Sequence, residues 1–270
     1  MSPFQSLILG VVQGVTEFLP ISSSGHLIII PYLFGWKAHP LEFDVFLHLG
    51  TLCAIVVYFF SDWRKLFAAA ISDRRWSLRG TGSSFTEAKL FWSIALATLP
   101  AVVAGVAFQQ WAEGAFRRAE FVALSLGGFA LVFCLAQILG RNNRPLSELG
   151  IKDALFIGCF QALAIFPGVS RSAATISAGL FLGLNRKAAV RFSFLLAAPV
   201  LLGAGIWEGA GLFSGGHNLP FSRFGMGFLA AFLSGLLSIH FILRFINRHS
   251  FNAFIIYRLV LCLLIMAIFF

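Results

Sequence analysis

The chain has 270 residues, of which 59% are hydrophobic and only 11% are charged, and its mean hydropathy is +0.87. A water-soluble domain of this length cannot bury that much apolar surface, so the composition excludes a soluble protein and predicts an all-α polytopic membrane protein. The net charge of +9 does not call for nucleic acid as a partner, because Lys and Arg in the loops of a membrane protein set its topology.

The first apolar stretch, residues 4–19, is helix-like but too short to cross a bilayer. About 16 residues at 1.5 Å each cover roughly 24 Å of a hydrocarbon core that is about 30 Å thick. Pro20 and a serine run break it before a second short apolar piece, so residues 4–36 are predicted to form a re-entrant helix–loop–helix hairpin. Full spans are expected at about 43–60, 89–110 and 121–139.

This pattern recurs after a polar, basic stretch at 141–152. A second hairpin is predicted at 153–184, followed by spans at about 188–212, 221–245 and 253–270. The chain therefore divides into two repeats, 1–140 and 141–270, within one integrated membrane domain. Because each repeat crosses the membrane three times after its hairpin, the repeats are inverted, and the two hairpin tips are expected to meet near the midplane.

The basic residues predict the orientation of these spans. In this topology fourteen Lys and Arg residues lie on the side opposite the N-terminus, and only four lie on the N-terminal side. The positive-inside rule then places both termini outside the cytoplasm and opens the first hairpin outward.

The segment QGVTEFLPISSSGH, residues 13–26, gathers polar side chains between apolar flanks, where each needs a partner. Gln13 and Glu17 are four residues apart and share a helix face. A carboxylate beside a carboxamide suits a divalent cation such as Mg²⁺ or Ca²⁺, which also binds substrate phosphate. The alternative for Glu17 is a structural carboxylate paired with a hydroxyl or an arginine.

Four residues of the same segment precede a half-helix whose free N–H groups form an anion site: Ser22, Ser23, Ser24 and Gly25. Ordinary helix caps explain such serines equally well. His26 favours a catalytic role for this segment over simple capping, because an imidazole beside a hydroxyl can serve as general base toward a serine nucleophile or a water. A structural histidine is the alternative.

A second polar segment, PGVSRSAAT at 167–175, has the matching features. Arg171 carries a guanidinium that can bind phosphate oxygens in pairs, and Glu17 is its expected partner before substrate arrives. We expect the two segments to form one site. Further phosphate-binding candidates in this segment are Gly168, Ser170, Ser172 and Thr175. Isolated polar residues in other apolar runs are interpreted as pinning helices together: His48, His240, Glu208 and Arg258.

The first segment resembles the (E/Q)-x-x-x-E and serine–histidine motif of bacterial undecaprenyl-diphosphate phosphatases of the bacitracin-resistance type, and the second is similar to their PGxSRSxxT motif. The resemblance extends over essentially the whole chain. It implies an inner-membrane enzyme that removes the terminal phosphate of the C55 lipid carrier diphosphate with a divalent cation, in support of peptidoglycan synthesis. Bacitracin would then act indirectly, by sequestering the lipid substrate.

The resemblance transfers roles to matching positions. Gln13 and Glu17 match the acidic motif, Ser23 and His26 the serine–histidine motif, and Arg171 the phosphate-binding arginine. The first position of the acidic motif is Gln13 here, which the family admits but which leaves a single carboxylate in the motif. His48 stands where the family often has glutamine, and close to the site it would either replace a hydrogen bond or add a base. The mechanism stays open between attack by Ser23 and direct attack by water. The competing function is a transporter or lipid flippase, because inverted repeats with broken helices are common there. Surrounding lipids are expected contacts, and a homo-oligomer is compatible with the sequence.

Overall fold

The computed structural model describes residues 1–72, 87–113, 115–214 and 221–269, which are helical apart from loops and one isolated bridge. Within these residues, six helices are long and apolar enough to cross a membrane. They are α3 (Leu41–Tyr58), α5 (Glu87–Glu113), α6 (Ala119–Leu139), α9 (Arg186–Ser214), α10 (Phe221–Phe245) and α11 (Asn252–Phe269). The predicted all-α membrane fold with six spans is confirmed.

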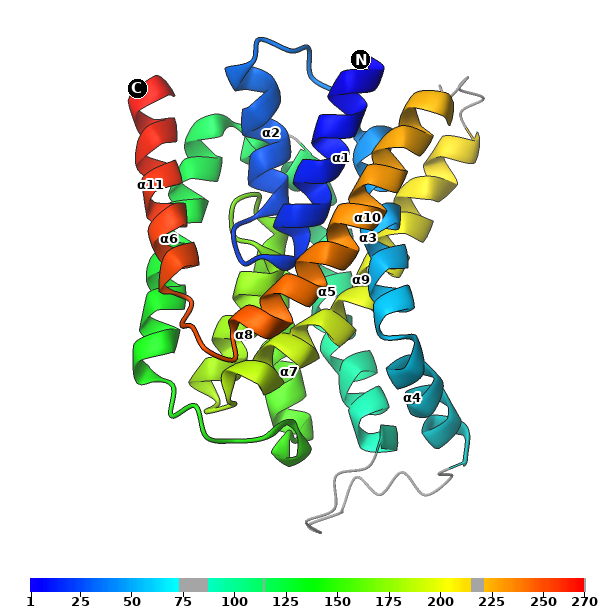
Figure 1. Ribbon diagram of the computed structural model, residues 1–270, viewed down its shortest axis with the longest axis vertical. Coiled ribbons are helices and arrows are strands. Elements are labelled where there is room, and N and C mark those ends of the chain that lie inside the picture. Colours follow the sequence, from blue (N-terminus) through cyan, green and yellow to red (C-terminus); the bar gives the residue numbers. More distant parts are fainter. Residues whose placement is uncertain (73–86, 114, 215–220, 270) are drawn as a thin grey trace.

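Two units of short helices accompany the spans. The first joins α1 (Pro3–Phe18) to α2 (Ser23–Leu33), and the second joins α7 (Ile151–Ala162) to α8 (Arg171–Phe181) through the 3₁₀ turn η3 (Leu163–Ile165). The helices break at the two predicted places, and both connections lie near mid-height of the molecule (Figure 1). Their re-entrant course through the bilayer stays a prediction.

The ends of the chain lie on one side of the molecule. Figure 1 shows both termini at the same end, as the predicted topology requires, and α4 (Phe60–Ser72) at the other. Helix α4 was not predicted from the sequence, because this segment is polar and connects two apolar spans. Its Asp62 forms an ion pair with Arg191 at the start of α9.

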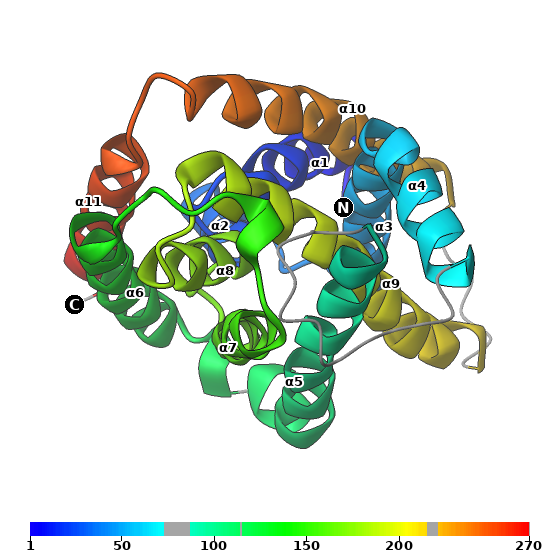
Figure 2. The ribbon, with the colours of Figure 1, turned by 90° about the horizontal axis from the view of Figure 1, so that it is seen from below.

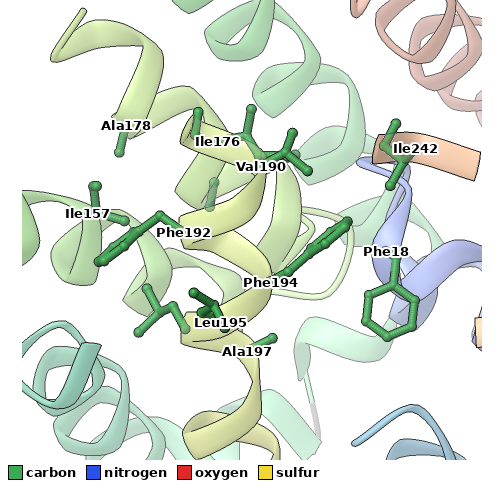
Figure 3. Packing of buried hydrophobic residues seen from close by; sticks show 14 of the residues in the cluster. Phe18, Ile157, Ile176, Ala178, Val190, Phe192, Phe194, Leu195, Ala197 and Ile242 are labelled. Atoms are coloured by element: carbon green, nitrogen blue, oxygen red, sulfur yellow. The ribbon is translucent and has the colours of Figure 1, made fainter. Parts of the chain in front are cut away.

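The short helices α2 and α8 lie in the middle of the bundle, with the remaining helices around them (Figure 2). Phe18 at the end of α1 packs edge-to-face on Phe194 of α9, with ring centroids 5.5 Å apart. Val190, Phe192 and Leu195 extend this cluster along α9 toward α7 and α8 (Figure 3). The apolar core thus lies directly against the first connection.

Glycines let each short-helix unit approach one span closely. A Cβ at Gly14 of α1 would lie 2.1 Å from Ser234 Oγ and 2.4 Å from Ala231 O of α10, and a Cβ at Gly158 of α7 would lie 2.5 Å from Ala97 O of α5. Such backbone contact is typical of helix pairs in membranes. Because lipid removes the hydrophobic driving force between helices, they associate through the close packing that small residues allow.

Arg258 of α11 ties both connections together. It is fully buried, and its guanidinium donates to Pro20 O (3.4 Å) in the first connection and to Gly168 O (2.9 Å) and Val169 O (3.1 Å) in the second. It also donates to Leu126 O of α6 (3.1 Å). The interpretation of Arg258 as a residue that pins helices is therefore supported by its contacts.

We expect Gly14→Ala to destabilise the protein, because the added methyl group must displace the α10 backbone, at a cost of about 1–3 kcal/mol. The measurement is the unfolding temperature of the purified protein in detergent. Gly128→Ala is the control, since a Cβ there meets nothing within 4 Å. Equal unfolding temperatures for the two variants would contradict the close α1–α10 contact.

Arg258→Leu should lower the unfolding temperature and abolish function, because buried carbonyl oxygens left without donors cost about 1–3 kcal/mol each. Arg258→Lys should recover part of the stability, since an ammonium still donates to some of these oxygens. The exposed Arg248 provides the control Arg248→Leu, which we expect to leave the unfolding temperature unchanged. An Arg258→Leu variant as stable as this control would refute the role given to Arg258.

Candidate active site

Glu17 is the centre of the polar cluster. Its side chain is only 5% exposed, and it accepts hydrogen bonds from three groups. Ser23 Oγ donates to Oε2 at 2.6 Å, Gln13 Nε2 donates to the same oxygen at 3.2 Å, and Arg171 Nη2 donates to Oε1 at 3.2 Å. The prediction that Glu17 and Arg171 meet across the two segments is confirmed by this geometry.

The two connections end in the same local structure. Ser22 caps α2 and Ser170 caps α8, each with its hydroxyl accepting an N–H three residues on at 3.3 Å. Both have positive φ, 74° for Ser22 and 71° for Ser170, which is uncommon for residues other than glycine. Each cap hydroxyl also lies beside the serine two residues later, Ser24 or Ser172.

This match makes Ser23 and Arg171 equivalent, because each is the first residue of its half-helix. Both contact the Glu17 carboxylate, one on each oxygen. Within the described part of the chain, the N–H groups of Ser23 and Ser24, and those of Arg171 and Ser172, have no acceptor. Two helix N-termini therefore present free N–H groups, an arrangement that binds anions.

A cavity of about 450 Å³ opens beside Glu17. Its polar end contains five of the predicted site residues: Glu17, Ser23, Ser24, Ser170 and Arg171. Its remaining wall is mostly apolar and comes from α2, α3, α5, α7, α9, the η3 region and the 3₁₀ turn η1 (Ala115–Arg117). A diphosphate head group at the polar end would thus have room for an apolar tail beside it.

His26 does not contact Ser23, contrary to the predicted pairing. Its Nδ1–H donates to Ser22 O at 2.7 Å, because a carbonyl can only accept, so Nε2 accepts from Tyr257 Oη at 2.6 Å. The ring also stacks on Tyr257 of α11 and is not part of the cavity lining. The acceptor beside the Ser23 hydroxyl is Glu17 instead.

Several phosphate-binding candidates lie behind the cavity lining and hold the connections in place. Thr175 Oγ1 is 2.6 Å from Ser193 Oγ of α9, and Ser172 Oγ donates to Leu19 O at 3.2 Å. Gly168 has φ +101°, and a Cβ there would lie 2.5 Å from Val122 O of α6. Gly25 donates its N–H to the cap Ser22. Thr175 was predicted to bind phosphate together with Arg171, but it does not line the cavity.

Two residues that line the cavity, His48 and Gln161, were not predicted to belong to the site. His48 was interpreted as pinning helices, but its Nδ1–H donates to Asp44 O of its own helix, and Nε2 lies in the cavity 3.9 Å from Glu17 Oε2. Gln161 of α7 donates to Ala97 O, while its buried Oε1 has no partner in the described residues. The resemblance singled out His48 as a departure from the family, but no sequence signal placed either residue in the cavity, because helix rotation decides which side chains face it.

Another polar group borders the cavity near α3. Asp44 is bound by Arg117 Nη2 at 3.0 Å and by His39 Nε2 at 2.6 Å. Asp44, Arg117 and His48 all line the cavity, so a second guanidinium lies in the same space as Arg171.

Two other residues were predicted to hold helices together. His240 contacts Tyr58 Oη at 3.1 Å across α3 and α10. The side chain of Glu208 lies outside the described residues.

Glu17 and Gln13 carry oxygen atoms of the kind that a hard divalent cation binds. The carboxamide oxygen of Gln13 is buried and has no donor in the described residues, while the carboxylate of Glu17 lies beside that carboxamide. The described residues contain no group of three or more His, Cys, Asp or Glu side chains placed for a metal. Mg²⁺ commonly binds with one or two carboxylates and takes its remaining ligands from water and substrate phosphate.

The chain is similar to known proteins over nearly its whole length. "Undecaprenyl-diphosphatase" of Caldicellulosiruptor bescii is 42% identical over 270 residues, covering 99% of this chain and 97% of the relative. The protein of that name from Desulforudis audaxviator is 41% identical, covering 99% and 98%, and the one from Idiomarina loihiensis is 38% identical over the full length of both chains. A family model described as "Bacitracin resistance protein BacA" matches residues 6–264, so the chain belongs to the bacitracin resistance protein BacA family.

Proposed function

We propose that this protein is an undecaprenyl-diphosphate phosphatase, which hydrolyses the lipid diphosphate to undecaprenyl phosphate and inorganic phosphate. The observation that carries the proposal is the Glu17 carboxylate, held by Ser23 from one half-helix and Arg171 from the other at the polar end of an otherwise apolar cavity. The relatives named undecaprenyl-diphosphatase support this substrate. They give no support to the alternative of a transporter or flippase.

Arg171 is the group that first meets the substrate. Its Nη1 donates to Ser193 O at 3.2 Å, which holds the guanidinium while Nη2 contacts Glu17. The terminal phosphate of the substrate replaces Glu17 on Nη2 and accepts hydrogen bonds from the free N–H groups of the two half-helices. These donors also face the charge that develops on the phosphoryl group in the transition state, where such groups contribute most to rate.

Ser23 is the proposed nucleophile. Its hydroxyl proton passes to Glu17, Oγ forms a bond to the terminal phosphorus, and the bond from that phosphorus to the bridging oxygen breaks, which releases undecaprenyl phosphate. Glu17 releases the proton that it took from Ser23, and water then attacks the phosphoserine. One proton of this water stays on the inorganic phosphate that leaves, and the other is passed by Glu17 to Ser23 Oγ as the bond from Oγ to phosphorus breaks, which restores the Ser23 hydroxyl. The 2.6 Å contact between Ser23 Oγ and Glu17 Oε2 favours this route over direct attack by water.

Glu17, with the carboxamide oxygen of Gln13, would hold the divalent cation, Mg²⁺ or Ca²⁺. When bound, such a cation neutralises charge on the phosphate oxygens. The roles of the protein's own groups are unchanged by it: Arg171 and the N–H groups orient the phosphate, Ser23 attacks, and Glu17 accepts the proton.

The protein is a multi-pass membrane protein. We place it in the bacterial inner membrane with both termini and the cavity on the periplasmic side, because basic residues cluster at the opposite end. Its product is the lipid carrier for peptidoglycan synthesis, and bacitracin would compete by sequestering the substrate. The membrane lipids around the spans, and a second copy of the chain, are further candidate partners.

The proposal predicts chelator-sensitive release of phosphate from undecaprenyl diphosphate by the purified protein. Arg171→Ala should lower kcat by about 10²–10³-fold, the usual cost of losing one transition-state donor. Glu17→Gln should lower kcat by about 10²–10⁴-fold, the usual contribution of a general base. Arg118→Ala is the matched control for Arg171, because Arg118 is exposed outside the cavity and pairs only loosely with Glu120 at 3.6 Å. If well-folded wild-type protein released no phosphate, the proposed phosphatase activity would be refuted.

The covalent route predicts a phosphoserine at position 23. Rapid acid quench with ³²P-labelled substrate should trap the label on Ser23, and Ser23→Ala should lose both the label and most activity. Ser24→Ala should keep the label, since the contact with Glu17 is made by Ser23. His26→Gln should retain more activity than Ser23→Ala, because His26 faces Tyr257. Burst kinetics without any labelled protein would establish attack by water instead.

A further inference from the structure

The apolar wall of the cavity is most exposed where α5 and α9 form it. Val102 and Val106 of α5 and Trp207 of α9 line the cavity, and 49%, 59% and 58% of their surfaces are exposed. By contrast, Leu27 of α2 lines the cavity but is buried. The cavity therefore opens sideways between α5 and α9, in the C-terminal half of each span, and exposed apolar side chains at that depth face lipid.

Both helices have a glycine in the rim of this opening. Gly105 of α5 and Gly203 of α9 line the cavity, and a Cβ added to either would meet none of the described residues within 4 Å. Gly158 differs, since a Cβ there would lie 2.5 Å from the α5 backbone. A glycine inside a helix costs about 1 kcal/mol relative to alanine. At Gly105 and Gly203 no helix contact requires glycine, so what glycine provides there is empty space.

We propose that Gly105 and Gly203 keep open the passage through which the isoprenoid chain of the substrate leaves the cavity between α5 and α9, and that they thereby determine which chain lengths the enzyme accepts. This inference rests on the proposed function for the identity of its occupant. It adds the passage itself and two residues that the polar site does not contain.

The chemistry of the passage fits one occupant. The head group is held at the polar end by Arg171 and the two helix N-termini, so the tail must extend along the remaining wall. The lining on α5 and α9 is apolar: Ala101, Val102, Gly105, Val106, Val200, Leu201, Gly203, Ala204 and Trp207. A cavity of about 450 Å³ holds a diphosphate and the first isoprene units of the chain. The rest of an undecaprenyl chain has to cross the rim into the bilayer.

Leucine at the rim positions provides the first test. We expect Gly105→Leu and Gly203→Leu to lower kcat/KM for undecaprenyl diphosphate by about tenfold or more, and to leave kcat/KM for geranyl diphosphate within about twofold of wild type. The short chain ends inside the cavity, whereas the long chain must pass the added side chain. Gly128→Leu is the matched control, because Gly128 is exposed on α6 with nothing near its Cβ and does not line the cavity.

An equal fall for both substrates in the rim variants would overturn the passage, as would an equal loss for undecaprenyl diphosphate in the Gly128→Leu control. Unfolding temperatures near that of wild type should accompany the selective loss. A rim variant that fails to fold is replaced by Gly105→Ala or Gly203→Ala, for which we expect a smaller loss of the same selectivity.

Photolabelling of wild-type protein tests the route without relying on turnover. A farnesyl diphosphate analogue with a diazirine at its distal end should label residues 101–106 and 200–207, as read by mass spectrometry of the peptides. Label confined to α2, α6 or α11 would overturn the inference. Labelling at the rim by protein that releases no phosphate would refute the proposed function but support the passage. Phosphate release with label elsewhere would refute only the passage.

Discussion

The ion pair between Glu17 and Arg171 is the interaction on which the site depends. Both side chains are nearly buried inside a membrane protein, where a buried charge without a partner costs several kcal/mol. Each therefore requires the other, and this requirement joins two connections that are more than 150 residues apart in the chain. Arg258 serves the same end without a carboxylate, because its guanidinium satisfies backbone oxygens from both connections.

The two connections show how one local structure can perform two tasks. Ser22 and Ser170 cap their half-helices with the same φ and the same hydrogen bond, so the first helical residue of each points to the same carboxylate. In one connection that residue is Ser23, the proposed nucleophile, and in the other it is Arg171, the proposed phosphate ligand. Both half-helices begin with N–H groups that have no acceptor in the described residues, so the roles we propose for the two connections differ only through the first side chain of each half-helix.

The sequence predicted those features that follow from local patterns. Apolar length gave the six spans, and Pro20 and Pro167 marked the helix breaks. The directions of individual side chains were not predictable in the same way. His26 follows Ser23 by three residues, yet packing of α2 against α11 turns it toward Tyr257. His48 lies in the cavity because α3 rotates that face toward Glu17, and such rotation depends on contacts between distant helices.

The central claim is that two half-helix N-termini form a single diphosphate site. The most direct measurement is an experimental structure with a methylene diphosphonate analogue of undecaprenyl diphosphate. The account predicts that the terminal phosphonate contacts Arg171 together with backbone N–H groups from the starts of both α2 and α8. A head group that contacts only one of the two half-helices, or that leaves the Glu17–Arg171 pair intact, would contradict it.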